Sequence, residues 1–178
     1  YKYCFRDMKK IINPWEGLDG YMCFGCAPNN PLGLHMEFFE DGDDIVAFWK
    51  PQGTYQGWLR TLHGGIQTTL MDELAGWVVL RKLQTSGVTS RLDAKFMKSI
   101  STDEPQLTIR GRMTDRKRNA IFIETTFLVT AGHAQCGHQR FTRTVHHAAD
   151  DGDVHRGDNV FQTLLQGIHR TDHIELLT

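Results

Sequence analysis

The pattern of apolar positions predicts one long helix between two groups of strands. Apolar residues recur at helical spacing over residues 65–83. They include Ile66, Leu70, Leu74, Trp77 and Val78. Further apolar residues fill most other faces of this segment, which is typical of a buried helix.

Short strand-like runs lie on both sides of the helix. The predicted strands are residues 34–39, 45–49, 88–97, 106–114, 121–130 and 134–145. The last of these puts Cys136 and His138 on one side, and a basic turn at residues 116–119 separates two of the others. A single helix must bury all its faces, and a strongly curved antiparallel sheet wrapped around it does so. The sequence therefore predicts the α+β class.

The chain divides into three parts. Residues 1–31 are rich in Gly and Pro, which predicts an irregular lead-in with a short helix around residues 6–12. Residues 32–145 form the predicted domain of helix and strands. Residues 146–178 form a tail with a short amphipathic helix, for which Asp158 is the expected N-cap.

Composition and charge are those of an ordinary globular protein. The 178 residues suit one domain with a core. A net charge of −1 gives no overall attraction to nucleic acid or an anionic membrane, so neither is an expected partner. No apolar run reaches the ~18 residues of a transmembrane helix. The start lacks the order of a signal peptide and the four cysteines are too few for a disulfide scaffold, so we expect a cytoplasmic protein with free thiols.

The segment that carries candidate chemistry begins at His63-Gly64-Gly65, where the long helix starts. The first N–H groups of a helix have no intrahelical acceptor, and the helix dipole makes them attractive to negative charge. Glycine also lets another group approach the backbone closely. Such donors suit the oxyanion that forms when a thioester carbonyl is attacked.

Asp72 lies about two turns further along the helix. It shares a stripe with Thr68, Thr69 and Gly76, the small or polar side of an otherwise apolar helix. An isolated Asp on a helix is ordinarily a solvated residue. Its spacing from Gly64-Gly65 on a buried helix favours a site, in which it acts as general base or as nucleophile on the thioester carbonyl.

These residues also resemble a known family. His63-Gly64-Gly65 followed by Leu70-Met71-Asp72-Glu73 resembles the signature of hotdog-fold thioesterases of the phenylacetate-pathway type. Cys23-Phe24-Gly25-Cys26 and the segment 30–34 resemble the entry segment of one branch, so the resemblance covers residues 22–145. It implies a hotdog fold, in which a curved antiparallel sheet wraps one long central helix. It also implies hydrolysis of an acyl-CoA, no cofactor apart from the CoA of the substrate, and a homodimer or dimer of dimers with sites between two subunits.

The resemblance assigns roles residue by residue. The N–H of Gly64 or Gly65 forms the oxyanion hole, Asp72 is the catalytic carboxylate, and an amide side chain in the preceding loop assists. Here Gly57 stands at the amide position, so its neighbour Gln56 is the candidate. Gly76 stands where a hydroxyl residue is often found, so that hydroxyl comes from elsewhere or is missing.

Other residues are candidates for substrate binding. They are His63, Gly57, Tyr55, Trp58, Thr69, Lys98, Arg116, Lys117 and Arg118. Tyr55 and Trp58 are candidate walls of an acyl pocket, and the basic residues are candidates for the phosphates of CoA. A solvated basic turn is the plain alternative for residues 116–118. We interpret His63 as a structural hydrogen-bonding residue at the helix entrance rather than as a base.

Three alternatives bear on the function. Cys23 and Cys26 form a C-x-x-C pair, but no second pair has suitable spacing, so we expect no metal site. A non-catalytic acyl-CoA-binding protein is favoured by the departures at Gly57 and Gly76. A hotdog hydratase or dehydratase needs a site His paired with a carboxylate, and His63 is the one residue placed for that role.

Overall fold

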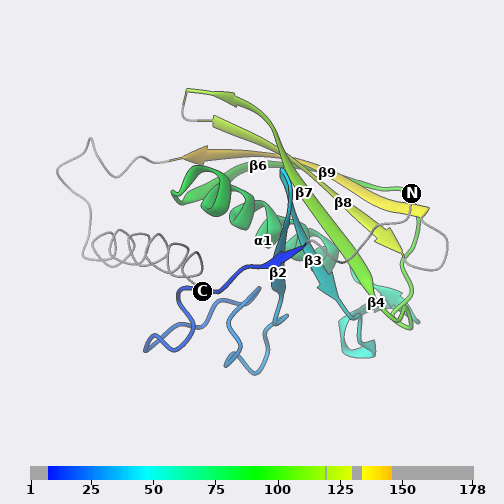
Figure 1. Ribbon diagram of the computed structural model, residues 1–178. Coiled ribbons are helices and arrows are strands. Elements are labelled where there is room, and N and C mark those ends of the chain that lie inside the picture. Colours follow the sequence, from blue (N-terminus) through cyan, green and yellow to red (C-terminus); the bar gives the residue numbers. More distant parts are fainter. Residues whose placement is uncertain (1–7, 119, 130–133, 146–178) are drawn as a thin grey trace.

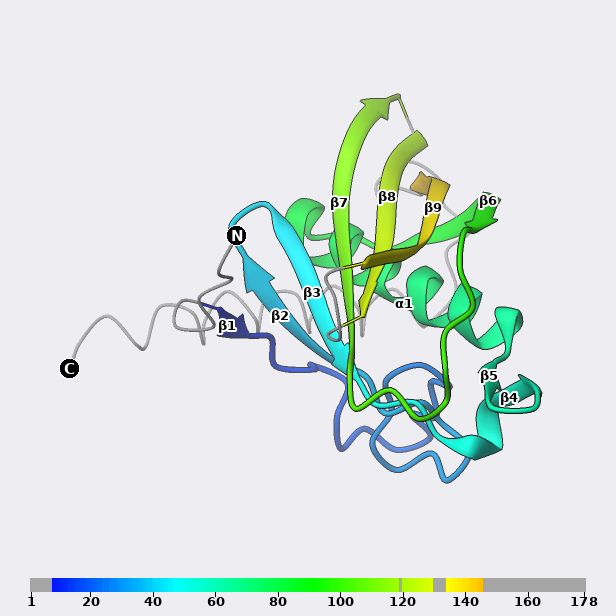
Figure 2. The same ribbon diagram turned by 90° about the vertical axis from the view of Figure 1, so that its right-hand side faces the viewer.

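The computed structural model describes residues 8–118, 120–129 and 134–145, the last of these as backbone only. A seven-stranded antiparallel sheet has the order β1-β2-β3-β7-β8-β9-β6. Its strands are Lys9–Lys10 (β1), Glu37–Asp41 (β2), Asp44–Trp49 (β3), Gly87–Phe96 (β6), Leu107–Lys117 (β7), Ala120–Val129 (β8) and Ala134–Val145 (β9). The sheet curves over one long helix, as Figures 1 and 2 show from two directions.

The helix α1 spans Gly64–Leu83, as the apolar pattern predicts. Strands β7 and β8 turn alternate residues toward it, and Ile109, Ile123 and Phe127 are fully buried. Gly111 permits a close approach of β7 to α1, because a Cβ there would lie 3.2 Å from side-chain atoms of both Leu74 and Val78. The α+β class and the curved antiparallel sheet around one helix are confirmed.

The connection before α1 is more ordered than the loop expected over residues 51–62. It contains a 3-10 turn, Gly53–Tyr55, and a small hairpin of Gln56–Trp58 (β4) and Thr61–Leu62 (β5). The backbone of Leu62 donates to Ile100 and that of Thr102 donates to Arg60. The hairpin and the β6–β7 connection therefore hold each other at the start of α1.

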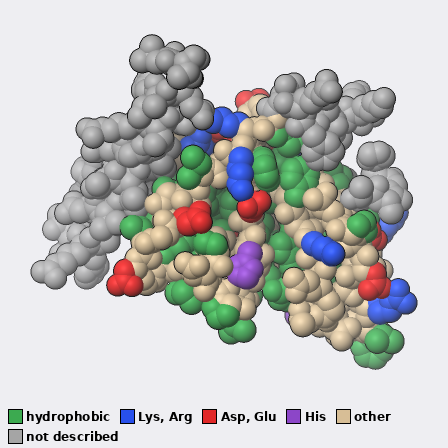
Figure 3. Space-filling model, turned by 60° about the horizontal axis from the view of Figure 1, so that its bottom comes forward, with side chains coloured by type: hydrophobic (Ala, Val, Ile, Leu, Met, Phe, Trp, Pro, Cys, Tyr) green, Lys and Arg blue, Asp and Glu red, His purple; other side chains and the backbone are tan. Residues whose placement is uncertain are grey.

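The lead-in packs onto α1 and joins the same core. Ile11 and Cys26 are buried in it, and Trp15 contacts the ring of Trp77 on α1, with ring centroids 5.8 Å apart. Other lead-in side chains, such as Met22, are exposed, and hydrophobic side chains are scattered over the lower face in Figure 3. The lead-in is mostly turns, yet it covers part of the helix.

Three predicted details are wrong. The described part of the predicted helix at residues 6–12 contains β1 instead. Its extended backbone pairs with the outer edge of β2 and satisfies backbone hydrogen-bonding groups there. The first long strand starts at Glu37 rather than at residue 34, because His35 has a left-handed backbone with φ 51°. Strand β7 runs on to Lys117, so Arg116 and Lys117 belong to the strand and not to a turn.

The predicted tail helix and its cap at Asp158 lie outside the described residues, as do the side chains of Cys136 and His138. Within the described ranges, no helix is long and apolar enough to span a membrane.

Candidate active site

The start of α1 is capped by His63. Its Nδ1 accepts a hydrogen bond from the backbone N–H of Gly65 over 2.8 Å. This hydrogen bond agrees with the interpretation of His63 as a structural residue, and its role toward a substrate stays a prediction. The cap also makes the two glycines different as hydrogen-bond donors, because the N–H of Gly65 already has an acceptor. Among the described residues we find no acceptor for the N–H of Gly64.

Gly57 lies directly against this cap. A Cβ at Gly57 would be 2.9 Å from His63 Cδ2 and 3.1 Å from His63 Cα. A side chain at the position to which the resemblance assigns an amide would therefore require His63 to shift. The neighbouring Gln56 uses its amide oxygen locally, accepting from the backbone N–H of Arg60 over 3.2 Å.

Asp72 lies half-buried on α1 and contacts the edge strand β6. The hydroxyl of Thr89 donates to Asp72 Oδ1 over 2.5 Å. This supplies a hydroxyl next to the carboxylate from a different element than Gly76. Sequence reasoning missed Thr89, because the pairing of β6 beside α1 is not visible in residue spacing.

Gly64 and Asp72 are far apart within one chain. An α-helix rises about 1.5 Å per residue, so their backbones are separated by roughly 12 Å along the axis. One thioester carbonyl cannot reach both groups of the same chain.

The candidate acyl-pocket residues differ in their surroundings. Tyr55 is half-buried, and its hydroxyl donates to the backbone oxygen of Gly33 over 3.2 Å. Trp58 is 79% exposed. Thr69 donates to the backbone oxygen of Gly65 within α1, over 2.9 Å.

The basic candidates lie at two ends of the sheet. Lys98 follows β6, whose last residue, Phe96, would be 3.5 Å from a Cβ on Gly64. Arg116, Lys117 and Arg118 lie at the other end of β7, roughly 33 Å from its start at ~3.3 Å per residue. Lys98 therefore shares an end of the sheet with the helix entrance, and the basic hairpin does not.

A second cluster of reactive groups lies where the lead-in meets α1. Cys23 Sγ is 3.5 Å from Glu73 Oε1, and the cysteine pair and this carboxylate line a cavity of about 420 Å³. The hydrogen bond from Cys26 lowers the pKa of Cys23 to about 7. The same bond, together with burial, raises the pKa of Cys26. Glu73 is a further group that sequence reasoning missed, because 47 to 50 positions separate it from the two cysteines.

Residues 59–133 match the model of the thioesterase superfamily. This segment belongs to the thioesterase superfamily. The match covers β5, α1 and the strands β6, β7 and β8, and with them both His63-Gly64-Gly65 and Asp72.

Similar solved structures share the fold. A hypothetical thioesterase protein with coenzyme A from Streptococcus pneumoniae is 24% identical, with a TM-score of 0.57 over 62% of this chain and 85% of that chain. Zebra fish thioesterase superfamily member 2 is 18% identical, with a TM-score of 0.58 over 62% and 81%. A Streptococcus mutans protein bound to acetyl-CoA is 17% identical, with a TM-score of 0.59 over 74% and 97%. No curated protein sequence matches significantly. At these identities the likeness shows the fold, and the expected hotdog fold is confirmed.

Proposed function

We propose that this protein hydrolyses an acyl-CoA thioester to a free acid and CoA. The observation that carries the proposal is the half-buried Asp72 with the Thr89 hydroxyl on its Oδ1 at 2.5 Å, in a thioesterase-superfamily segment that also holds Gly64 at the start of α1. Coenzyme A and acetyl-CoA are bound by two proteins of the same fold. We infer the substrate class of this chain, an acyl-CoA, from the ligands of these two proteins.

In the proposed reaction, Gly64 N–H donates to the thioester carbonyl. Attack on the carbonyl carbon moves negative charge onto its oxygen, and one well-placed donor contributes about 3–4 kcal/mol to the transition state. Asp72 either removes a proton from the attacking water or attacks directly to give an anhydride that water then hydrolyses. The CoA thiolate leaves in both versions.

The roughly 12 Å between Gly64 and Asp72 supports a site built from two chains. In a two-fold pair, Gly64 of one chain faces Asp72 of the other. Exposed apolar side chains at the helix entrance, among them Phe96 at 50% exposure and Trp58 at 79%, are suited to such contacts. We propose a homodimer or a dimer of dimers on this basis.

The phosphates of CoA need cations near the helix entrance. Lys98 of the same chain is placed for this at the end of β6. Arg116, Lys117 and Arg118 serve in the proposal only through a second chain, because they lie at the opposite end of the sheet. Gln56 keeps its proposed assisting role only through the amide nitrogen, since its oxygen accepts from Arg60.

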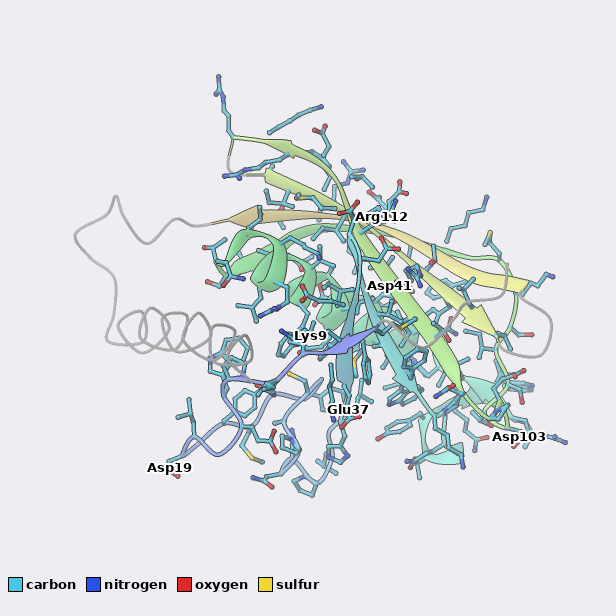
Figure 4. All side chains as sticks on the ribbon, viewed as in Figure 1. Lys9, Asp19, Glu37, Asp41, Asp103 and Arg112 are labelled. Carbon is cyan, nitrogen blue, oxygen red and sulfur yellow. The ribbon has the colours of Figure 1, made fainter. Side chains whose placement is uncertain are left out.

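The test is thiol release from short, long and aromatic acyl-CoAs by the wild type and by Asp72→Asn. We expect kcat to fall by about 10²–10⁴-fold while folding is retained. Asp19→Asn is the matched control, because Asp19 is an exposed carboxylate in the lead-in, at the edge of the molecule in Figure 4. Unchanged turnover in Asp72→Asn would refute the assignment.

A second function, acyl-CoA binding without turnover, is favoured by Gly57. No amide side chain fits there against His63. Equilibrium binding of a non-hydrolysable acyl-CoA analogue by the wild type, with no thiol release from the matching thioester, would support this alternative.

A further inference from the structure

The structure joins the C-x-x-C pair of the lead-in to a carboxylate on α1. The candidate ligand atoms of Cys23, Cys26 and Glu73 all lie within 4.8 Å of one another. We propose that these three side chains bind a divalent ion of the zinc class. The sequence shows two ligands and gave no reason to expect a metal; the fold supplies the third.

The distances suit a tetrahedral ion. Zinc lies about 2.3 Å from a thiolate and about 2.0 Å from a carboxylate oxygen, which puts the sulfur and oxygen roughly 3.5 Å apart at a tetrahedral angle. Cys23 Sγ lies 3.5 and 3.6 Å from the two oxygens of Glu73. Sulfur and carboxylate donors together are typical of zinc sites rather than of magnesium or calcium sites.

Further contacts hold the ligands in place. Trp77 Nε1 donates to Glu73 Oε1 over 3.2 Å, and the Tyr21 hydroxyl lies 2.9 Å from Cys26 Sγ. Asn13 in turn donates to the Tyr21 hydroxyl over 3.1 Å and to the backbone oxygen of Cys26 over 3.3 Å. Such outer contacts orient metal ligands in known sites.

Gly25, between the two cysteines, has no side chain and so leaves space for the carboxylate of Glu73. A Cβ there would lie 2.4 Å from Glu73 Cδ. The carboxylate therefore packs against the backbone of the C-x-x-C turn. Gly25→Ala would push Glu73 away from the sulfur atoms without removing any ligand.

The site has an open position. Three protein ligands leave one corner of a tetrahedron, as in zinc sites that bind a water or a substrate. All three side chains line the cavity of about 420 Å³, together with the apolar Trp15, Trp77 and Leu80. The fourth ligand is therefore a water or a small donor molecule that enters this cavity.

The experiment uses the full chain, reduced and freed of metal with a chelator, and titrated with Co²⁺. We expect one Co²⁺ per chain, with thiolate-to-cobalt charge-transfer absorption and the intense visible bands of a tetrahedral site, both abolished by Zn²⁺. Imidazole should shift the visible bands by occupying the open position. Unshifted bands would overturn the open position.

Variants locate the ion. Cys23→Ser and Cys26→Ser each leave one thiolate, so each should lose part of the charge-transfer absorption and weaken binding by roughly 100-fold or more, since losing outer contacts alone costs roughly 10–100-fold. Glu73→Gln keeps an acceptor for Trp77 and should weaken binding by a smaller factor, with altered visible bands. Cys4→Ser and Cys136→Ser are the controls and should bind as the wild type does. Circular dichroism checks that each variant is folded.

Two results would overturn the metal site. One is reduced wild type without charge-transfer absorption, and the other is wild-type binding by folded Cys23→Ser. Loss of two thiols on mild oxidation of a chain that binds no Co²⁺ would instead assign the pair to disulfide chemistry. None of these readouts depends on thioester hydrolysis.

Discussion

At the scale of single residues, the candidate site rests on two hydrogen bonds. His63 accepts from Gly65 N–H, and for this reason Gly64 is the proposed donor for a substrate oxygen. Thr89 donates to Asp72, which fixes one oxygen of the carboxylate. Each arrangement can be tested by removing one hydrogen-bonding group while the shape is kept.

Removing the Gly64 N–H isolates its role. Gly64 is the first helical residue, where proline is tolerated, and its predecessor His63 has an extended backbone with ψ 132° that suits a following proline. Gly64→Pro should therefore fold and lower kcat by about 10²–10³-fold. Gly64→Ala, which keeps the N–H, should lose much less. Equal losses of acyl-CoA turnover in Gly64→Pro and Gly64→Ala would show that the added side-chain volume, and not the loss of the N–H donor, lowers the activity.

Removing the Thr89 hydroxyl tests the positioning of Asp72. Thr89→Val keeps the shape, and we expect kcat for acyl-CoA to fall by about 10-fold, the equivalent of about 1.4 kcal/mol. The KM should change little, because Thr89 is proposed to act through Asp72. Thr89→Ser retains a hydroxyl and should restore most of the activity. A Thr89→Val enzyme with unchanged kcat would remove Thr89 from the site.

At the scale of elements, α1 is tied to its surroundings at both ends. Its start is held by the β4–β5 hairpin and the β6–β7 connection, where Asp103 accepts from Arg60 Nε over 2.7 Å, at the edge of the molecule in Figure 4. Near its end, Arg81 and Lys82 pair with Glu40 of β2 at 3.1 and 3.4 Å. These contacts fix where the helix entrance and Asp72 stand relative to the sheet.

Gly57 packs tightly against His63 where the β4–β5 hairpin meets α1. Gly57→Ala should destabilise the protein by about 1–3 kcal/mol, because its Cβ would collide with His63. Gly53→Ala is the matched control, since a Cβ there meets nothing within 4 Å. Urea unfolding measures both. Similar stabilities for the two variants would contradict the close contact.

The Glu40 pair should make stability depend on pH. Burial raises the pKa of Glu40, but the hydrogen bonds and charges of Arg81 and Lys82 outweigh it and leave this pKa below its usual value. Because the folded pKa is lowered, the stabilisation is complete above the unfolded value of about 4.3 and is lost as pH falls through the folded pKa.

Glu40→Gln should therefore cost about 0.5–1 kcal/mol at pH 7, and the difference from wild type should vanish in acid. Glu37→Gln, which breaks the exposed pair with Lys10, is the control and should cost less. Unfolding by urea at several pH values measures both variants. A cost for Glu40→Gln that persists in strong acid would contradict this reading.

At the scale of the whole molecule, the proposed active site combines groups from two copies of the chain. Gly64 and Asp72 are roughly 12 Å apart along α1, which is why the proposal pairs Gly64 of one copy with Asp72 of the other. Among the described strands, β6, which lies next to Asp72, is at the edge of the sheet and pairs with β9.

Mixing two inactive chains tests this arrangement. Gly64→Pro and Asp72→Asn chains, unfolded together and refolded, should recover about one quarter of the wild-type activity. Random reassociation makes half of the dimers mixed, and each mixed dimer keeps one intact site of two. Each variant refolded alone should stay inactive. A mixture that also stays inactive would place both groups in one chain.

The sequence by itself determined the long helix, most strands of the sheet and the segment that carries the candidate chemistry. Periodicity records which face of an element is buried, and His63, Gly64 and Asp72 are close enough in sequence for helix geometry to relate them. Tertiary structure decided that Thr89 meets Asp72, that Gly57 leaves no space for an amide, and that Glu73 joins Cys23 and Cys26. Each of these contacts spans elements whose approach depends on packing of the whole sheet against α1, which no local pattern encodes.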